Sequence, residues 1–125
     1  MNATLLVMAG GAVGAAGRYH LGRLAFHLGP MGYPYATLAA NVTGGFLMGA
    51  LVGILARGNM SDEPWRLLLG VGLLGGFTTF SAFSLEVVNM IERGAWGTAA
   101  GYALISVIGS VLALFAGLMT VRVLA

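Results

Sequence analysis

The sequence predicts an all-α integral membrane protein that crosses the bilayer four times. Of its 125 residues, 58% are hydrophobic and only 8% are charged, and the mean hydropathy is +0.91. A soluble domain of this length does not need so much apolar surface. The length accommodates four spans of about 20 residues each with short loops. We therefore treat residues 1–125 as a single membrane domain.

The composition also excludes several classes of protein. The net charge of +2 comes from arginines scattered along the chain, which is too little for nucleic-acid binding. Because the chain contains no cysteine, disulfides and thiolate metal sites are ruled out. No Ser/His/Asp constellation, metal-ligand spacing or phosphate-binding loop indicates an enzyme. The N-terminus lacks the basic region of a signal peptide, so we expect the first apolar segment to be retained as a span.

The first predicted span covers residues 5–24 and is rich in glycine. Gly10 and Gly14 form a small-xxx-small pair, which lets another helix approach closely. Arg18 lies within the last turns, where a charge is costly unless it reaches the interface, pairs or faces water. Two interpretations stay open: an interfacial anchor, or part of a water-filled vestibule that attracts anions.

The second predicted span covers residues 35–56. Gly45, Gly49 and Gly53 fall on one face, a pattern typical of close helix packing. Asn41, in the first third of this span, needs hydrogen-bond partners in a hydrocarbon environment. It is either a polar link between helices or a pore-lining amide donor.

The third predicted span covers residues 64–91 and is longer than the bilayer requires. At its middle, the Gly75-Gly76 pair weakens the helix. Phenylalanines at positions 77, 80 and 83 would form one stripe on a continuous helix. Irregular backbone at this depth survives only inside protein or beside a wet cavity. We therefore predict a helix that is broken near its middle and lines a polar path, with hydroxyls from Thr78, Thr79, Ser81 and Ser84.

The fourth predicted span covers residues 98–121. Tyr102, Ser106 and Ser110 recur at intervals of four and form a polar stripe on an otherwise apolar helix. Glu86, near the end of the third span, has a carboxylate that is either functional or simply reaches a vestibule, and the sequence leaves its role open.

The arginines predict no preferred orientation in the membrane. With four spans, three fall on each side, so the positive-inside rule gives no bias. The expected result is dual insertion and an antiparallel homodimer about a two-fold axis in the membrane plane. Carbonyls freed between Gly75 and Thr78 would then be presented twice, forming an oxygen cage suited to a hard monovalent cation. Hydroxyls, an amide and aromatic ring edges along the path suit a small anion.

Three stretches together resemble one known family. Residues 10–19 (GGAVGAAGRY), 41–45 (NVTGG) and 75–84 (GGFTTFSAFS) are similar to the Fluc (CrcB) fluoride channels, and the likeness covers the whole chain. The third stretch is the most specific. The resemblance implies a dual-topology homodimer in the bacterial plasma (inner) membrane, with two pores that passively export toxic fluoride. Ala82 departs from the family, which often has threonine at this position.

The resemblance also implies roles for individual residues. Phe80 and Phe83 match the phenylalanines whose ring edges face fluoride, and Asn41 matches the pore asparagine. Gly75 and Thr78 match the positions whose carbonyls hold a central, structural sodium ion. The remaining matches are Ser81, Ser84, Tyr102 and Ser110, which resemble the polar track and its ends, and Arg18, which resembles the arginine near the vestibule.

Two other functions fit part of the pattern. A small dual-topology multidrug or cation exporter has a similar size and charge balance, but such proteins generally need a carboxylate in the first span, which has none. A non-transporting membrane scaffold fits the glycine-rich helices and leaves the hydroxyl and phenylalanine cluster without a purpose.

Overall fold

The computed structural model describes residues 2–26, 33–57 and 62–124, and these residues form helices and no strand. The elements are α1 (Ala3–Phe26), α2 (Tyr35–Leu55), α3 (Asp62–Trp65), the π-helix η1 (Arg66–Leu74), α4 (Gly75–Phe77), α5 (Phe80–Glu92) and α6 (Trp96–Leu124).

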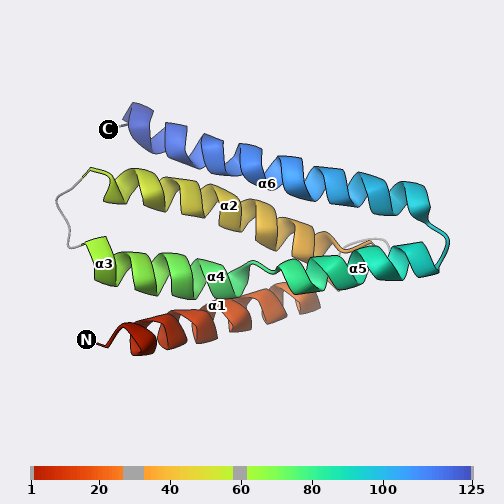
Figure 1. Ribbon diagram of the computed structural model, residues 1–125, viewed down its shortest axis with the longest axis horizontal. Coiled ribbons are helices and arrows are strands. Elements are labelled where there is room, and N and C mark those ends of the chain that lie inside the picture. The colour runs from red at the N-terminus through yellow and green to blue at the C-terminus, as the bar shows by residue number, and fades with distance from the viewer. Residues whose placement is uncertain (1, 27–32, 58–61, 125) are drawn as a thin grey trace.

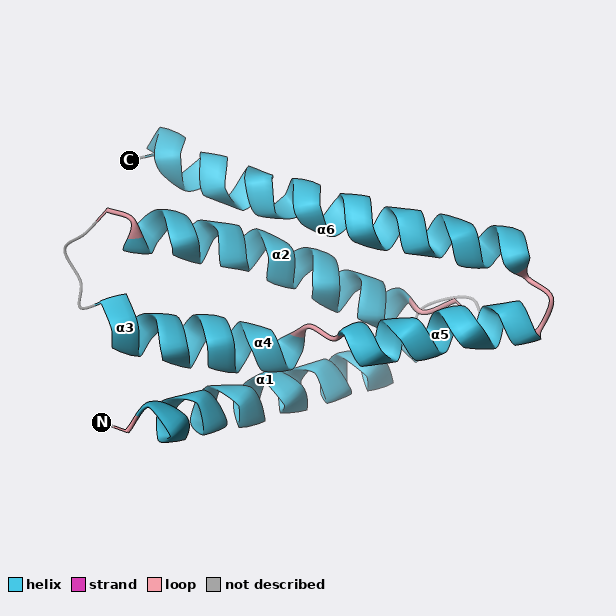
Figure 2. Cartoon of the chain, viewed as in Figure 1, coloured by secondary structure: helices cyan, strands magenta, loops and turns pink. Residues whose placement is uncertain are grey.

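The helices run up and down in one bundle, and both chain ends lie at the same end of it (Figure 1). Helix α2 packs along α6, while α1 packs along η1 and α4. The series from α3 to α5 lies between α1 and α2, with a short non-helical link between α4 and α5 (Figure 2). This arrangement places the link beside α2, in the interior of the bundle.

Three segments are long and apolar enough to cross a membrane: Tyr35–Leu55, Glu63–Glu92 and Trp96–Leu124. Their outward faces are apolar; on α6, for example, Leu104 and Leu112 are each 61% exposed. Helix α1 has 24 residues, which at about 1.5 Å per residue is long enough to span, but it is less apolar than the other three. The class of the protein is therefore an all-α membrane protein.

Glycines set the distance between neighbouring helices. A Cβ atom added at Gly49 would overlap the carbonyl oxygen of Leu114, and one at Gly117 would overlap that of Phe46. In the same way, Gly14 faces the carbonyl of Leu73. The structure confirms the prediction that the small-residue faces of α1 and α2 carry close helix packing.

Helical structure stops after Phe77 and resumes at Phe80. Thr78 (φ −85°, ψ 158°) and Thr79 (φ −154°, ψ 125°) are both extended. Because the helix is interrupted, the three phenylalanines do not share one helical stripe: Phe77 lies on α4, and Phe80 and Phe83 lie on α5. The ring of Phe77 faces Gly17 of α1 instead.

The packing of α2 against α6 gives a direct test. We expect Gly117→Ala to lower the free energy of unfolding by roughly 1–3 kcal/mol, because its methyl group would force the two backbones apart. The measurement is thermal unfolding of the purified protein in detergent. Gly97→Ala, at the start of the same helix, is the matched control, since its added Cβ meets no atom within 4 Å. Equal melting temperatures for the two variants would contradict this account of the packing.

Candidate functional site

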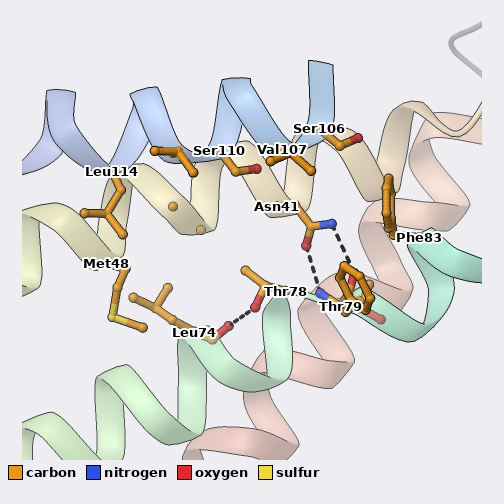
Figure 3. A pocket seen from close by; sticks show the side chains of 14 residues that line it. Asn41, Met48, Leu74, Thr78, Thr79, Phe83, Ser106, Val107, Ser110 and Leu114 are labelled. Carbon is orange, nitrogen blue, oxygen red and sulfur yellow. Dashed lines mark hydrogen bonds between the residues drawn. The ribbon is translucent and has the colours of Figure 1, made fainter. Parts of the chain in front are cut away.

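The side chain of Asn41 joins α2 to the link between α4 and α5. Its Oδ1 accepts a hydrogen bond from the backbone N–H of Thr79 (2.8 Å), and its Nδ2 donates to the carbonyl of Thr79 (3.1 Å). An extended residue turns its own N–H and C=O to the same side, as in a β-strand. The Asn41 carboxamide therefore occupies the place that a neighbouring strand would take (Figure 3).

Side-chain hydroxyls make further hydrogen bonds at this break. Thr79 Oγ1 accepts from the N–H of Ala82 (3.1 Å) and so caps α5, and it lies 3.3 Å from Ser81 Oγ. Thr78 Oγ1 donates to the carbonyl of Leu74 (3.0 Å), which also accepts from the Thr78 N–H. The break is thus an ordered, hydrogen-bonded structure, as unpaired backbone groups in this environment would require.

The carbonyls of Gly75 and Thr78 both lack their usual helical donors, because the N–H of Thr79 donates to Asn41 and the N–H of Ala82 donates to Thr79 Oγ1. In a continuous helix the carbonyl of Gly75 would accept from the N–H of Thr79, but that N–H donates to Asn41. Gly75 itself is exposed. Among the described residues no group of three or more His, Cys, Asp or Glu side chains could hold a metal ion. Backbone carbonyl oxygens such as that of Gly75 are of the donor type that hard cations prefer.

A cavity of about 390 Å³ opens beside the break, between α2, α5 and α6. Five of the predicted site residues line it: Asn41, Thr78, Phe80, Phe83 and Ser110. The rest of its wall, much of it visible in Figure 3, comes from Gly44, Gly45, Met48, Leu74, Thr79, Ser106, Val107, Val111 and Leu114.

The two phenylalanines of the cavity differ in exposure. Phe83 is 9% exposed, whereas Phe80 is 76% exposed, an unusual value for so large an apolar side chain. Their ring centroids lie 5.4 Å apart with planes tilted by 42°. The edge of a phenyl ring carries the positive part of its quadrupole, so tilted rings can present weakly positive edges to the same space.

Tyr102 and Glu86 belong to a second cluster, next to the cavity. The Tyr102 hydroxyl donates to Glu86 Oε1 (3.0 Å), and Thr37 Oγ1 donates to Glu86 Oε2 (2.9 Å). The Tyr102 ring packs on Phe83, with centroids 5.2 Å apart. A smaller cavity of about 210 Å³ lies beyond this cluster, lined by Tyr33, Pro34, Glu86 and Met90. The Phe83 and Tyr102 rings therefore link the large cavity to the hydroxyl–carboxylate cluster at the small one.

Five predicted site residues lie outside the lining of both cavities: Gly75 and Tyr102, described above, and Arg18, Ser81 and Ser84. Ser81 contacts Thr79, and the hydroxyl of Ser84 donates to the carbonyl of Phe80 (2.9 Å). Arg18, in α1, is partly buried, and its Nε is buried without a hydrogen-bond partner in the described part of the chain. The geometry thus gives Ser84 an ordinary intrahelical bond and leaves a donor on Arg18 free.

Three residues have contacts at the site that sequence reasoning did not predict: it placed the Thr79 hydroxyl on the polar path and Ser106 in a polar stripe, and it gave Thr37 no role. Thr79 supplies the backbone groups that Asn41 binds. Thr37 holds Glu86. Ser106 is 5% exposed, lines the large cavity and has an Oγ without a hydrogen-bond partner. Its place in the stripe with Tyr102 and Ser110 was the available signal, because the three share one face of α6.

Comparison with known proteins agrees with this geometry. The profile of the family described as CrcB-like protein, Camphor Resistance (CrcB), matches residues 5–118. The chain belongs to the CrcB-like family. A relative from Phenylobacterium zucineum (strain HLK1), named fluoride-specific ion channel FluC, is 64% identical over 124 residues, covering 98% of this chain and 97% of its own.

Further relatives carry the same name. One from Caulobacter vibrioides (strain NA1000 / CB15N) is 55% identical over 123 residues, covering 98% of this chain and 97% of its own. One from Novosphingobium aromaticivorans is 52% identical over 124 residues and covers 98% of each chain. Family membership and the apolar helices together make this CrcB-like chain a multi-pass protein of the bacterial inner membrane.

The cap on α5 can be tested by itself. We expect Thr79→Val to destabilise the protein by about 0.5–2 kcal/mol, because the N–H of Ala82 loses its acceptor. Thr79→Ser retains a hydroxyl and should stay close to the unsubstituted protein. Thermal unfolding in detergent measures both variants. A serine variant as unstable as the valine variant would show that the hydroxyl does not act as the cap.

Proposed function

We propose that this protein is a fluoride-selective channel that exports fluoride passively and so lowers its cytoplasmic concentration. The observation that carries the proposal is the cavity at the break. Its wall contains an amide, several hydroxyls and two phenyl rings, and no carboxylate lines it. The names of the relatives at 52–64% identity point to the same ion.

The cavity suits an anion that must shed water without being trapped. Asn41 Nδ2 has a second N–H beyond the one given to Thr79, and the Ser106 hydroxyl has no partner in the described structure. Neutral donors and ring edges replace part of the hydration of a small anion while holding it weakly enough to leave. Arg18 would raise the anion concentration near the entrance, because an arginine whose Nε is unpaired still attracts anions.

The working unit in this proposal is an antiparallel homodimer of four-span chains, with α1 as the first span and the series α3 to α5 as an interrupted third span. Two features support it. Phe80 is 76% exposed beside the cavity, so one wall of the cavity needs a further covering. The arginines are balanced between the two ends of the bundle, which favours insertion both ways. Lipid and a second copy would then cover the apolar faces.

A structural sodium ion on the two-fold axis is part of the same proposal. Its ligands would be the carbonyls of Gly75 and Thr78, once from each chain. The donor set fits a hard monovalent cation: Gly75 is exposed, and the N–H that would occupy its carbonyl is bound to Asn41. When bound, the ion would neutralise the concentrated carbonyl dipoles and hold the two chains in register.

Flux measurements test the channel. Proteoliposomes containing the protein should release fluoride rapidly and electrogenically and retain chloride. We expect Phe80→Ile, Phe83→Ile and Asn41→Asp each to slow fluoride efflux by at least about tenfold, since each removes a ring edge or places a negative charge in the path. Phe115→Ile, on an exposed face of α6 away from the cavity, is the matched control. Unchanged efflux in all three cavity variants would rule out this path. Uptake of a lipophilic cation instead of fluoride release would favour the exporter.

Dual insertion is tested with single cysteines in this cysteine-free chain. We expect Glu92→Cys, at the end of α5, and Asn2→Cys, at the other end of the bundle, each to react to about half with a membrane-impermeant maleimide added outside intact cells. Complete labelling of one variant and none of the other would show a single orientation and contradict the antiparallel dimer.

A further inference from the structure

We infer that Asn41 is the positioning residue that aims the Thr78 carbonyl at the cation site, in addition to lining the anion path. The inference rests on the proposed sodium site, and it assigns to this chain the residue that shapes that site. It starts from a fact of covalent geometry: the Thr79 N–H held by Asn41 belongs to the same peptide unit as the Thr78 carbonyl.

That peptide unit is trans, as are the others in the described residues. In a trans peptide the N–H and the C=O point in opposite directions. Because Asn41 Oδ1 holds the Thr79 N–H at 2.8 Å, the Thr78 carbonyl points away from Asn41. The same contact removes the Thr79 N–H from the Gly75 carbonyl, so one hydrogen bond aims one proposed ligand and frees the other.

Contacts on both sides of the peptide unit keep it from turning. The second bond of Asn41, from Nδ2 to the Thr79 carbonyl, fixes the following peptide. Thr78 is held by its hydroxyl on the Leu74 carbonyl and by its methyl group against Gly44, where an added Cβ would overlap it. A hydrogen bond to the N–H also polarises the carbonyl of the same peptide, which makes that oxygen a stronger cation ligand.

The two ends of the Asn41 carboxamide thus serve two different ion sites. Its carbonyl oxygen faces the backbone that forms the cation site, and its remaining N–H faces the cavity that carries the anion. Loss of Asn41 should therefore weaken sodium binding as well as fluoride passage, an effect that a pore-lining donor alone would not produce.

Sodium-dependent thermal stability of the purified full-length protein tests the inference without using flux. Melting temperatures are compared in sodium chloride and in N-methyl-D-glucamine chloride at equal ionic strength, for the unsubstituted protein, Asn41→Ala and Thr79→Val. The unsubstituted protein should melt higher in sodium, because a ligand that binds only the folded state stabilises it. Asn41→Ala should need at least about tenfold more sodium for the same rise, the equivalent of one well-formed hydrogen bond.

Thr79→Val is the matched control, because it loses a hydrogen bond at the same break and keeps both backbone contacts to Asn41. It should melt lower in both salts with an unchanged sodium dependence. If the melting temperatures of Asn41→Ala and the unsubstituted protein depend equally on sodium, the inference is overturned, while the proposed cation site is still supported. Absence of any sodium effect in the unsubstituted protein would overturn both the cation site and the inference. The proposed fluoride channel is tested separately, by the efflux measurement.

A second measurement on the unsubstituted protein decides the matter if Asn41→Ala does not fold. Thr78 and Thr79 form the only Thr–Thr pair in the sequence, so labelling threonine with ¹³C at the carbonyl and ¹⁵N gives one unique correlation. We expect sodium to shift the Thr78 carbonyl signal, and the Thr79 N–H to resist deuterium exchange. A freely exchanging Thr79 N–H, or a Thr78 carbonyl signal indifferent to sodium, would overturn the inference.

Discussion

The pairing between the Asn41 carboxamide and the backbone of Thr79 is the constraint on which the rest of the site depends. Within a bilayer an unpaired N–H or C=O costs several kcal/mol. A helix can be interrupted there only if some other group takes over the lost hydrogen bonds. Asn41 supplies one acceptor and one donor in the spacing that an extended residue requires, and the Thr79 hydroxyl caps the helix that resumes.

Close backbone packing makes this pairing possible. The methyl group of Thr78 fits against Gly44, one helical turn from Asn41, and a side chain there would hold α2 away from the break. On the opposite side, Gly14 allows α1 to lie against the carbonyl of Leu73 just before the break. The glycines of α1 and α2 therefore do more than join helices: they bring an amide within hydrogen-bond distance of an irregular backbone segment.

Much of the fold could be predicted from sequence because the signals are local. Apolar runs, glycine faces and the Gly75-Gly76 pair each predict the structure of the segment in which they occur. The partners of the polar groups could not be predicted in the same way. Nothing in the sequence links Asn41 to Thr79 or Thr37 to Glu86, because these contacts depend on how far two helices slide along each other. For the same reason Tyr102, expected on the polar track, proved to be turned towards Glu86 and away from the large cavity.

The Glu86 cluster shows how one chain can combine a carboxylate with an anion path. Both oxygens of Glu86 accept from hydroxyls, one from Thr37 and one from Tyr102. Those two donors are therefore occupied and cannot bind an anion at the same time. Two further donors belong to residues that line the large cavity: Ser106 Oγ and the second N–H of Asn41. The hydroxyls of Thr37 and Tyr102 thus serve a fixed negative charge, whereas the donors of Asn41 and Ser106 are the ones suited to an anion in passage.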